Sequence, residues 1–475
     1  MTDQYLIVGA GSAGCVLADR LTAAGAHVVL LEAGPEIEGG LSDVVAGPSF
    51  FDALTQPQLH WPQLMARRTE EQDPRLYGRG RGVGGSSLVN AMVGLWGEVD
   101  DYDAWERDYG CDGWSWRDVE PYFRKISVPL TKASTGSLDQ VGRAMVETCR
   151  TLGWDLHRGP FPLGGIGRDV GPAALTRDDN GHRVSVADAY LSRARQRKTL
   201  QIRPDSLVDR LILEGRRVRG VVLSDGTEIS HGTVVLAAGA IHTPAILLRS
   251  GVERAGIGFG LQDHPSAPIT LQLREPCQPT NVAVTSLARF TSGEIPADLQ
   301  LLPLDHLGPQ APGYGLISVA LMYVESRGRV SLRSMQSDLE PDIDFALLSS
   351  DDDMRRLIAG VRHLRTLLHQ SPLAAIADGC FIDDQGTRFE DLPDDDASLA
   401  SWLRRGVGDY VHAAGTCAMG AVENENAVVD PHSRVIGYES VRICDASIFP
   451  RLPRANTHFP VMMAAEVLAD RWIQS

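Results

Sequence analysis

The sequence has no uninterrupted apolar stretch of the roughly 18–20 residues that a membrane-spanning helix requires. Its seven cysteines are an odd number, and none of them forms a Cys-x-x-Cys pair. Residues 1–4 lead directly into an apolar run, which leaves no room for a signal peptide. We therefore expect reduced thiols, no membrane partner and a cytoplasmic location.

Basic residues are also few, since 45 Lys and Arg face 61 Asp and Glu for a net charge of −16. The acidic excess is spread along the chain, which argues against nucleic acid or an anionic membrane surface as a partner. The acidic runs at 351–353 and 394–396 each precede a predicted helix, so we interpret them as solvated helix caps. No metal site is expected.

The remaining composition is that of a loop-rich globular enzyme. Hydrophobic residues make up 43% of the 475 residues, with 48 glycines and 27 prolines. A chain of this length exceeds what one hydrophobic core supports, so we expect two or three domains.

The first thirty residues predict a strand, a tight turn and a helix. The apolar run at 4–8 is followed by Gly9, Gly11 and Gly14, and residues 15–21 then repeat apolar side chains at helical spacing. Gly9 permits the turn, Gly11 lets the backbone approach a pyrophosphate, and Gly14 allows close helix–strand packing. The start of the helix offers free N–H groups to phosphates.

An acidic residue stands where a dinucleotide-binding fingerprint requires one. A second apolar run at 27–31 ends in Glu32, about twenty positions beyond the first glycine. We expect its carboxylate to accept hydrogen bonds from the adenosine ribose and to disfavour an additional phosphate there. NADP is therefore the least favoured ligand, while FAD and NAD both remain open.

A second glycine-rich loop occupies residues 77–87 and leads into an aromatic-rich segment. Glycine lets backbone N–H groups approach a flat ring or a phosphate directly, and Ser86, Ser87 and Asn90 supply polar contacts. We interpret this loop as a second part of a cofactor site rather than a linker.

These segments resemble the glucose-methanol-choline (GMC) family of flavoprotein oxidoreductases. The resemblance is carried by residues 5–34, 84–92 and 101–105, and again by 239–251 and 260–264. It implies an α/β protein with a Rossmann-like FAD-binding domain on a parallel sheet, and an α+β substrate domain with an antiparallel sheet. The resemblance also makes FAD the expected cofactor.

The hydrophobic pattern agrees with two kinds of sheet. Residues 234–238 form a continuous apolar run typical of a parallel strand covered on both faces, whereas residues 265–350 alternate with period two, which indicates an antiparallel sheet. We assign 1–125, 185–264 and 425–475 to the FAD-binding domain, and 126–184 and 265–424 to the substrate domain.

The resemblance assigns cofactor contacts residue by residue. They are Gly9, Gly11, Ser12, Ala13, Gly14, Glu32, Ala33, Arg79, Gly84, Gly85, Ser86, Asn90, Ala91, Met92, Val208, Ala238, Gly239, Asp445, Ala446, His458 and Phe459. Some relatives tether the flavin through a histidine at the position of Val89, so this resemblance implies non-covalent FAD. The chain departs from the family at 127–137, where it is shorter, and this puts the shape of the pocket entrance in doubt.

The C-terminal part carries the expected reactive groups. His412 lies in a segment of small residues and matches the family's catalytic histidine, and a histidine suits proton abstraction because its pKa lies near neutral. Asn456, which follows it by 456 − 412 = 44 positions, matches the family's second polar group. His458 is a rival for that role. We expect His264 to be structural or near the cofactor, and Cys417 to be a buried filler.

The resemblance implies oxidation of a primary alcohol, with the proton passing to His412 and a hydride to flavin N5. The segment around His412 is similar to that of relatives acting on hydroxymethyl groups of aromatic rings, which favours an aryl or heteroaryl alcohol. The alternatives are a flavin-containing hydroxynitrile lyase and a choline- or sugar-type dehydrogenase. Oxygen or another acceptor would reoxidise the flavin, and the oligomeric state stays open.

Overall fold

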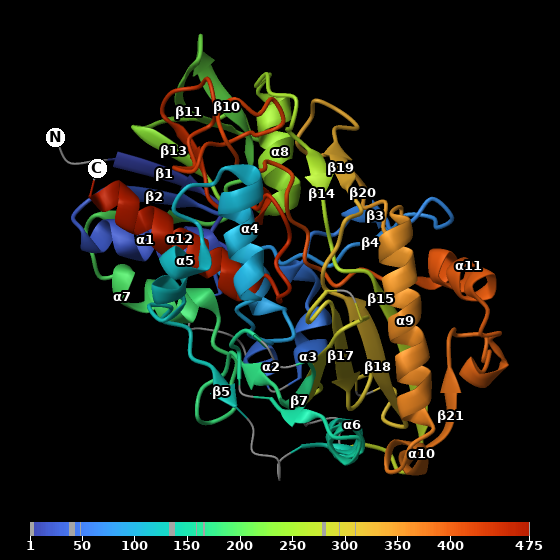
Figure 1. The fold of residues 1–475 in the computed structure, drawn as a ribbon. Helices are drawn as coiled ribbons and strands as arrows, with labels where there is room; N and C mark the ends of the chain where they lie inside the picture. Colours follow the sequence, from blue (N-terminus) through green and yellow to red (C-terminus); the bar gives the residue numbers. More distant parts are fainter. Residues whose placement is uncertain are drawn as a thin grey trace.

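The computed structural model of the chain describes residues 4–37, 43–47, 49–132, 138–157, 159–164, 167–277, 282–293, 295–308 and 310–474. It contains two large sheets that lie in different parts of the molecule (Figure 1). Residues 133–137 of the shortened region fall outside the described residues, while 131–132 form the short strand β5 (Thr131–Lys132).

The first large sheet is parallel and assembles strands that are far apart in the sequence. Its order is β22 (Val441–Ile443), β13 (Thr233–Leu236), β1 (Gln4–Val8), β2 (His27–Leu31) and β9 (Leu200–Arg203). β1 lies between β13 and β2 in the middle of the sheet. Its residues are almost all buried and apolar, which suits a strand that is covered on both faces. The predicted parallel sheet is confirmed.

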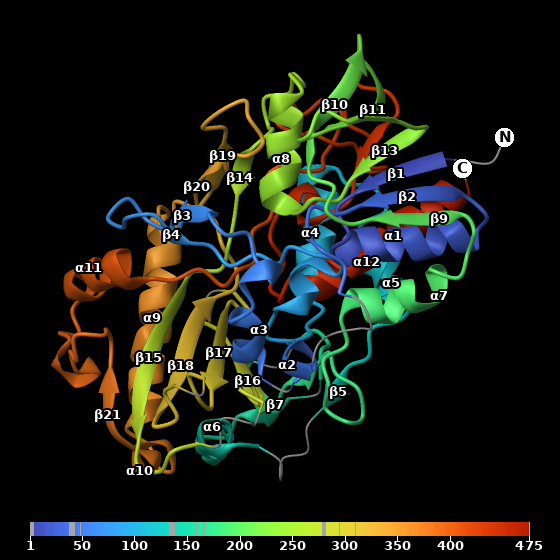
Figure 2. The same ribbon diagram turned by 180° about the vertical axis from the view of Figure 1, so that it is seen from behind.

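Two helices, one near each end of the chain, pack together beside this sheet. Helix α1 (Ser12–Ala23) packs beside α12 (His458–Ile473), and both lie at the end of the molecule where β1 begins (Figures 1 and 2). The ring of Tyr5 stacks on that of Trp472 at a centroid distance of 6.1 Å. Helix α8 (Gly239–Arg249) follows β13 and completes the βαβ pattern.

The second large sheet is mainly antiparallel, as the period-two pattern predicted. Its order is β21 (Ala377–Phe381), β15 (Ser266–Leu273), β18 (Tyr314–Leu321), β17 (Leu299–Leu304), β16 (Ser286–Phe290), β7 (Asp169–Pro172) and β6 (Asp155–Leu156). Helix α9 (Asp351–Leu368) runs along β18, and α6 (Gln140–Thr151) contacts β16 and β17. α9 is visible along this sheet in Figure 1.

Other described strands form smaller sheets. One contains β14 (Phe259–Leu261), β19 (Gly328–Ser331), β20 (Asp342–Asp344), β3 (Met65–Arg67) and β4 (Arg75–Leu76). Another contains β10 (Val208–Glu214), β11 (Arg217–Leu223) and β12 (Glu228–Ser230), and a third pairs β5 with β8 (Ala174–Leu175).

The remaining helices are short. They are α2 (Asp43–Ala46), α3 (Phe50–Leu54), α4 (Val99–Tyr109), α5 (Trp116–Phe123), α7 (Ser192–Ala194), α10 (Leu373–Ile376) and α11 (Asp396–Gly406), with a π-type turn at Ala187–Leu191 before α7. Among the described residues, no helix combines the length and the apolar character needed to cross a membrane. All seven cysteines are buried and unpaired.

The two acidic runs behave differently. Asp395 caps α11, because its carboxylate accepts a hydrogen bond from Ser398 N–H at 2.9 Å. The interpretation as a solvated cap is wrong for Asp353, which is fully buried. Its carboxylate accepts the N–H of Ser326 at 2.8 Å and pairs with Arg356 at 2.8 Å, so it holds a loop against α9.

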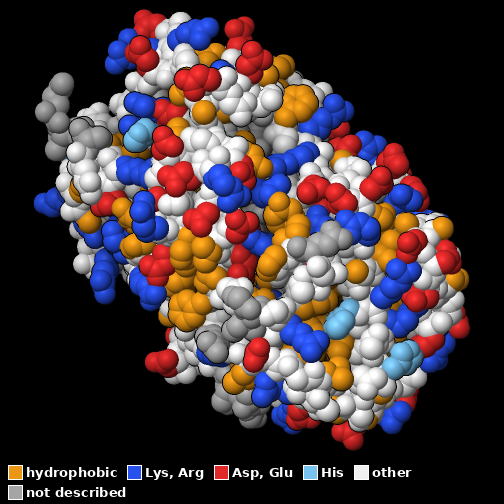
Figure 3. Space-filling view, in the orientation of Figure 1, with side chains coloured by type: hydrophobic (Ala, Val, Ile, Leu, Met, Phe, Trp, Pro, Cys, Tyr) orange, Lys and Arg blue, Asp and Glu red, His pale blue; other side chains and the backbone are white. Residues whose placement is uncertain are grey.

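Acidic and basic side chains are interspersed on the face shown in Figure 3, where no large patch of one sign stands out. This agrees with a net charge that is spread along the sequence.

Candidate active site

A cavity of about 530 Å³ is lined from both large sheets. Val8 and Leu31, at the carboxyl ends of β1 and β2, line one part of it, and Leu302 and Leu304 of β17 line another. In open α/β sheets, ligands bind at the carboxyl ends of the strands. The cavity therefore lies where a dinucleotide and a second ligand could meet.

Most of the residues predicted to bind the cofactor line this cavity. They are Gly9, Gly11, Ser12, Ala13, Glu32, Ala33, Arg79, Gly85, Ser86, Asn90, Ala91, Met92, Val208, Ala238, Gly239, Asp445, Ala446 and His458. The two predicted catalytic residues, His412 and Asn456, line it as well. The structure thus brings together segments separated by more than 400 positions.

Three predicted cofactor residues lie behind the cavity wall instead. A Cβ added at Gly14 would lie 1.9 Å from the carbonyl oxygen of Gly9, so this glycine serves the close helix–strand packing expected of it. Gly84 donates its N–H to Ala10 O at 2.8 Å and joins the two glycine loops. Phe459 is a buried core residue of α12.

The two glycine-rich loops touch each other through bare backbone. Gly9 has φ +104°, and a Cβ added to it would lie 2.4 Å from the carbonyl oxygen of Ala237. A Cβ added to Gly85 would lie 2.7 Å from the Cα of Gly11. A side chain at Gly85 would push the two loops apart, and one at Gly9 would push the first loop away from the residue that follows β13.

The start of α1 is the element that the sequence predicted to face a pyrophosphate. Ser12 and Ala13 begin the helix and line the cavity. The first N–H groups of a helix have no intrahelical acceptor, and the positive end of the helix dipole lies there. This arrangement suits a pyrophosphate.

Glu32 has a second role that the sequence did not reveal. One carboxylate oxygen accepts the N–H of Ala10 at 2.9 Å, and the other accepts those of Gly34 and Gly82 at 3.0 Å each. Burial raises the pKa of this carboxyl group, while the three N–H donors oppose that shift. Glu32 therefore fastens both glycine loops together as well as facing the cavity.

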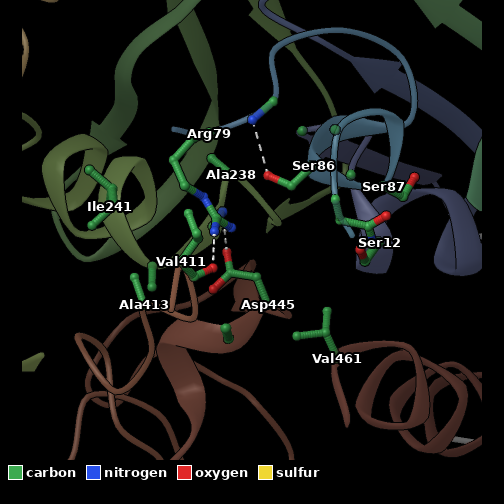
Figure 4. Close-up of a pocket in the computed structure, with 18 of the residues that line it drawn as sticks. Ser12, Arg79, Ser86, Ser87, Ala238, Ile241, Val411, Ala413, Asp445 and Val461 are labelled. Carbon is green, nitrogen blue, oxygen red and sulfur yellow. Dashed lines mark hydrogen bonds between the residues drawn. The ribbon is translucent and has the colours of Figure 1, made fainter. Parts of the chain in front are cut away.

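Asp445 anchors the opposite wall. Its carboxylate accepts hydrogen bonds from Gly239 N–H at 2.9 Å, Thr243 Oγ–H at 2.6 Å and Ser447 N–H at 2.8 Å. It therefore ties the start of α8 to the segment after β22. Figure 4 shows it between Ala238 and the C-terminal segments.

His412 is in contact with both residues that could assist it. Its Nε2 atom lies 3.4 Å from Asn456 Nδ2, and its Nδ1 atom lies 3.0 Å from Nδ1 of His264. Two nitrogens at that separation share one proton, and only one of them can be the donor. The contact with His264 was not foreseen, because 148 positions separate the two rings.

The backbone around His412 is held by the buried carboxylate of Asp263. One oxygen accepts the N–H of His412 at 2.9 Å and the hydroxyl of Tyr77 at 3.0 Å, and the other accepts the N–H groups of His264 at 2.7 Å and Tyr410 at 3.1 Å. Tyr77 in turn accepts a hydrogen bond from Ala413 N–H at 3.1 Å. Asp263 and Tyr77 were both missed by the sequence analysis.

Asp263, His264 and His412 together have the residue types of a metal site. Both oxygens of Asp263, however, already accept two hydrogen bonds each. The Nδ1 atoms of both histidines face each other at 3.0 Å. These contacts use the atoms that would ligate a cation, so we interpret the cluster as a support for His412.

The environment keeps His412 neutral. Burial, the neighbouring His264 and the cation of Arg79 all lower its pKa well below the usual value for histidine. The Arg79 guanidinium donates to the carbonyl of Val411 at 2.6 Å, as Figure 4 shows. Val411 has φ +60°, which is strained for a β-branched residue, and this bond holds the strained peptide next to His412.

His458 lies at the other end of this region. Its Nδ1 atom is 2.8 Å from the hydroxyl of Ser12 at the start of α1. Its Nε2 atom and Asn456 Oδ1 are both buried and have no hydrogen-bond partner among the described residues. Orphaned polar atoms beside a cavity fit a bound polar ligand.

Two further groups of lining residues were missed. Trp61 stacks on His242 at a centroid distance of 4.0 Å, and His242 bonds Glu340 at 2.9 Å. The second group forms an apolar wall beside His412 and Asn456 and consists of Phe50, Met92, Val93, Leu302, Leu304 and Tyr410. Of these six, Met92 was predicted, as a cofactor contact. No local sequence pattern marks this wall, because its residues come from four separate segments.

Comparison with protein families assigns the chain to a class. Residues 3–266 match the N-terminal domain model of the GMC oxidoreductases, and residues 324–465 match the C-terminal domain model. The chain belongs to the glucose-methanol-choline oxidoreductase family, as its motifs predicted. It is an FAD-dependent alcohol oxidoreductase, and the glycine loops, the start of α1 and the orphaned polar atoms fit that cofactor.

Individual relatives are similar along their whole lengths. The 5-(hydroxymethyl)furfural oxidase of Methylovorus sp. (strain MP688) is 33% identical, covering 99% of each chain. An oxygen-dependent choline dehydrogenase of Pseudomonas savastanoi pv. phaseolicola is 32% identical, covering 98% of this chain and 93% of the relative. The alignment with the furfural oxidase spans 549 positions, so that relative contains segments that this chain of 475 residues lacks.

The fold is shared with solved structures. Pyridoxine 4-oxidase from Mesorbium loti superposes with a TM-score of 0.91 at 27% identity, covering all of both chains. A fungal aryl-alcohol oxidase superposes with a TM-score of 0.79 at 20% identity, covering 100% of this chain and 99% of the other, and this likeness concerns the fold alone. The predicted fold class is confirmed.

Proposed function

We propose that the chain oxidises an aryl or heteroaryl primary alcohol to the aldehyde and binds FAD non-covalently. The observation that carries this proposal is the apolar wall of six residues beside the His412–Asn456 pair. An aromatic or furan ring would bury its faces against that wall, while its carbinol group reaches the two polar side chains. The 5-(hydroxymethyl)furfural oxidase is named for a ring substrate with a hydroxymethyl group.

The charges around the cavity disfavour choline. Three acidic residues line it: Glu32, Asp409 and Asp445. Glu32 and Asp445 are tied to the glycine loops and to α8, and Asp409 pairs with Arg68 at 2.6 Å. None of these carboxylates is available to hold a quaternary ammonium group beside His412, and the cation of Arg79 acts on that histidine.

The reaction needs a proton acceptor and a donor to the substrate oxygen. His412 Nε2 accepts the hydroxyl proton, because its Nδ1 hydrogen is engaged with His264. Asn456 Nδ2 donates to the same oxygen and stabilises its developing negative charge. When bound, FAD supplies the hydride acceptor.

The residues toward FAD take separate parts in this proposal. The N-terminus of α1 and the glycine loops would hold the pyrophosphate, and Glu32 and Val208 would face the adenosine. Asp445, Ala446 and His458 would face the part nearer the flavin. Val89 lines the cavity with an alkyl side chain that cannot form a covalent link, so acid precipitation of the protein should release all the FAD.

The deciding experiment is the anaerobic visible spectrum of the purified protein with benzylic, furanic, aliphatic, sugar and choline alcohols. Bleaching of the FAD band by ring alcohols supports the proposal, and bleaching by choline or sugars alone contradicts it. His412→Ala should retain the FAD band but lose about 10²–10⁴-fold in the reduction rate. Admission of air then separates an oxidase from a dehydrogenase.

A further inference from the structure

Tyr410 differs from the other five members of the apolar wall because it carries a hydroxyl group. Its ring packs against the cluster that contains Met92, Val93 and Leu302, and it lies edge-on to the ring of His412 at a centroid distance of 5.2 Å. Its backbone N–H is fixed by Asp263 at 3.1 Å. The position of this phenol is therefore set by the same carboxylate that fixes His412.

The hydroxyl of Tyr410 is buried and has no hydrogen-bond partner in the described structure. Buried polar groups in native proteins are almost always paired, and an unpaired one is costly. Burial raises the pKa of the phenol, so it is a neutral O–H donor at physiological pH. Leucine or phenylalanine would complete an apolar wall without that cost, which indicates that the hydroxyl meets a ligand.

We infer that Tyr410 is a specificity residue whose hydroxyl donates a hydrogen bond to an acceptor atom in or on the ring of the substrate. The substrate class is thereby narrowed to ring alcohols that carry an ether, carbonyl, hydroxyl or ring heteroatom in addition to the carbinol group. This inference rests on the proposed function, because it places the carbinol at His412. A site built to bond such an acceptor discriminates against analogues that lack it.

The test compares substrates of nearly equal shape. Methoxybenzyl and ethylbenzyl alcohols differ by an oxygen in place of a methylene, and each is available with the substituent ortho, meta or para to the carbinol. With the FAD-loaded enzyme, at least one methoxy isomer should exceed its ethyl counterpart about tenfold in the reduction rate constant divided by Kd, the size expected for one neutral hydrogen bond. In Tyr410→Phe this ratio should fall to about one.

Two further measurements do not depend on turnover. Binding of the matching methoxy- and ethylbenzaldehydes, followed by the shift of the oxidised FAD spectrum, should show the same preference and the same loss in Tyr410→Phe. The melting temperature of the FAD-loaded Tyr410→Phe enzyme should be equal to or above that of the wild type, because the variant lacks an unpaired buried hydroxyl. The control Tyr314→Phe, at a side chain that is 41% exposed on β18, should change none of these quantities.

The outcomes are distinct. An unchanged methoxy preference in Tyr410→Phe, no preference for any isomer in the wild type, or a clearly lowered melting temperature of the variant would each overturn the inference. If no alcohol bleaches FAD, the proposed function fails, and the aldehyde-binding ratio still decides the role of Tyr410.

Discussion

The Nδ1 atoms of His264 and His412 lie 3.0 Å apart, with the two rings almost perpendicular. If His412 is to accept a proton at Nε2, its own hydrogen must sit on Nδ1 and be donated to His264. Burial lowers the pKa of His264, while hydrogen bonds to the backbone of Pro453 and Met322 raise it. The effect of burial is the larger, so the pKa falls to about 3. A neutral His264 is therefore the acceptor that fixes the reactive form of His412.

Replacement of His264 by leucine should remove this acceptor. His412 could then adopt the tautomer with its hydrogen on Nε2, which cannot accept a proton there. We expect the rate of flavin reduction to fall about 10–100-fold, in the range found for partners that orient a reactive histidine.

The measurement for this variant is stopped-flow reduction between pH 5 and 9, with His369→Leu at an exposed position as the control. An unchanged reduction rate in His264→Leu would reduce His264 to a packing role.

The wild-type enzyme should keep its activity at mildly acidic pH. A base is active when unprotonated, and the pKa of His412 is held well below 6.5 by burial, His264 and Arg79. The reduction rate constant should therefore be flat from pH 9 to about 6.5 and decline only below that range. Arg79→Gln removes a repelling cation, so its decline should begin at higher pH. A wild-type midpoint at or above pH 7 would contradict this account.

The roles of Asn456 and His458 can be separated kinetically. Asn456 contacts His412, so Asn456→Ala should lower the reduction rate about 10²–10³-fold, as loss of a donor to a developing oxyanion does. His458 contacts Ser12 at the start of α1, so His458→Ala should weaken FAD binding and leave the rate at saturating FAD nearly unchanged. Titration with FAD and single-turnover kinetics provide the two readouts. The reverse result would make His458 the second catalytic group.

Individual strands, helices and glycine turns could be predicted from the sequence, because they depend on local patterns. The strand, turn and helix predicted at 4–21 follow from hydrophobic periodicity and appear as β1 and α1. The helix predicted at the acidic run 351–353 appears as α9. The residues at the glycine loops could be named because glycine is required there by backbone geometry.

Contacts between distant segments could not be predicted in this way. Asp263 holds the backbone of His412 from 149 positions away, and Tyr410 belongs to an apolar wall drawn from four segments. Asp353 was misread because an acidic residue in the first turn of a helix has the same local signature whether it faces water or, as here, a buried loop. Such residues are recognised only when the tertiary structure is known.

The final prediction concerns a buried ion pair that supports Asn456. Arg454, two positions before Asn456, donates from Nε to Asp101 Oδ1 at 2.8 Å, and its backbone N–H donates to Oδ2 at 2.8 Å. Both side chains are almost fully buried, so Asp101→Asn leaves a buried cation without its partner. We expect a loss of about 3–5 kcal/mol in the free energy of unfolding.

The same substitution should also slow flavin reduction in the protein that remains folded, because the segment carrying Asn456 loses its anchor. Asp100→Asn is the matched control: its carboxylate is 65% exposed and lies 4.0 Å from Arg454, so its effect should stay within about 0.5 kcal/mol. Urea unfolding of the FAD-loaded proteins measures the first effect and stopped-flow reduction the second. Equal stability of the two variants would show that Asp101 does not anchor this segment, because only Asp101 bonds the backbone of Arg454 as well as its side chain.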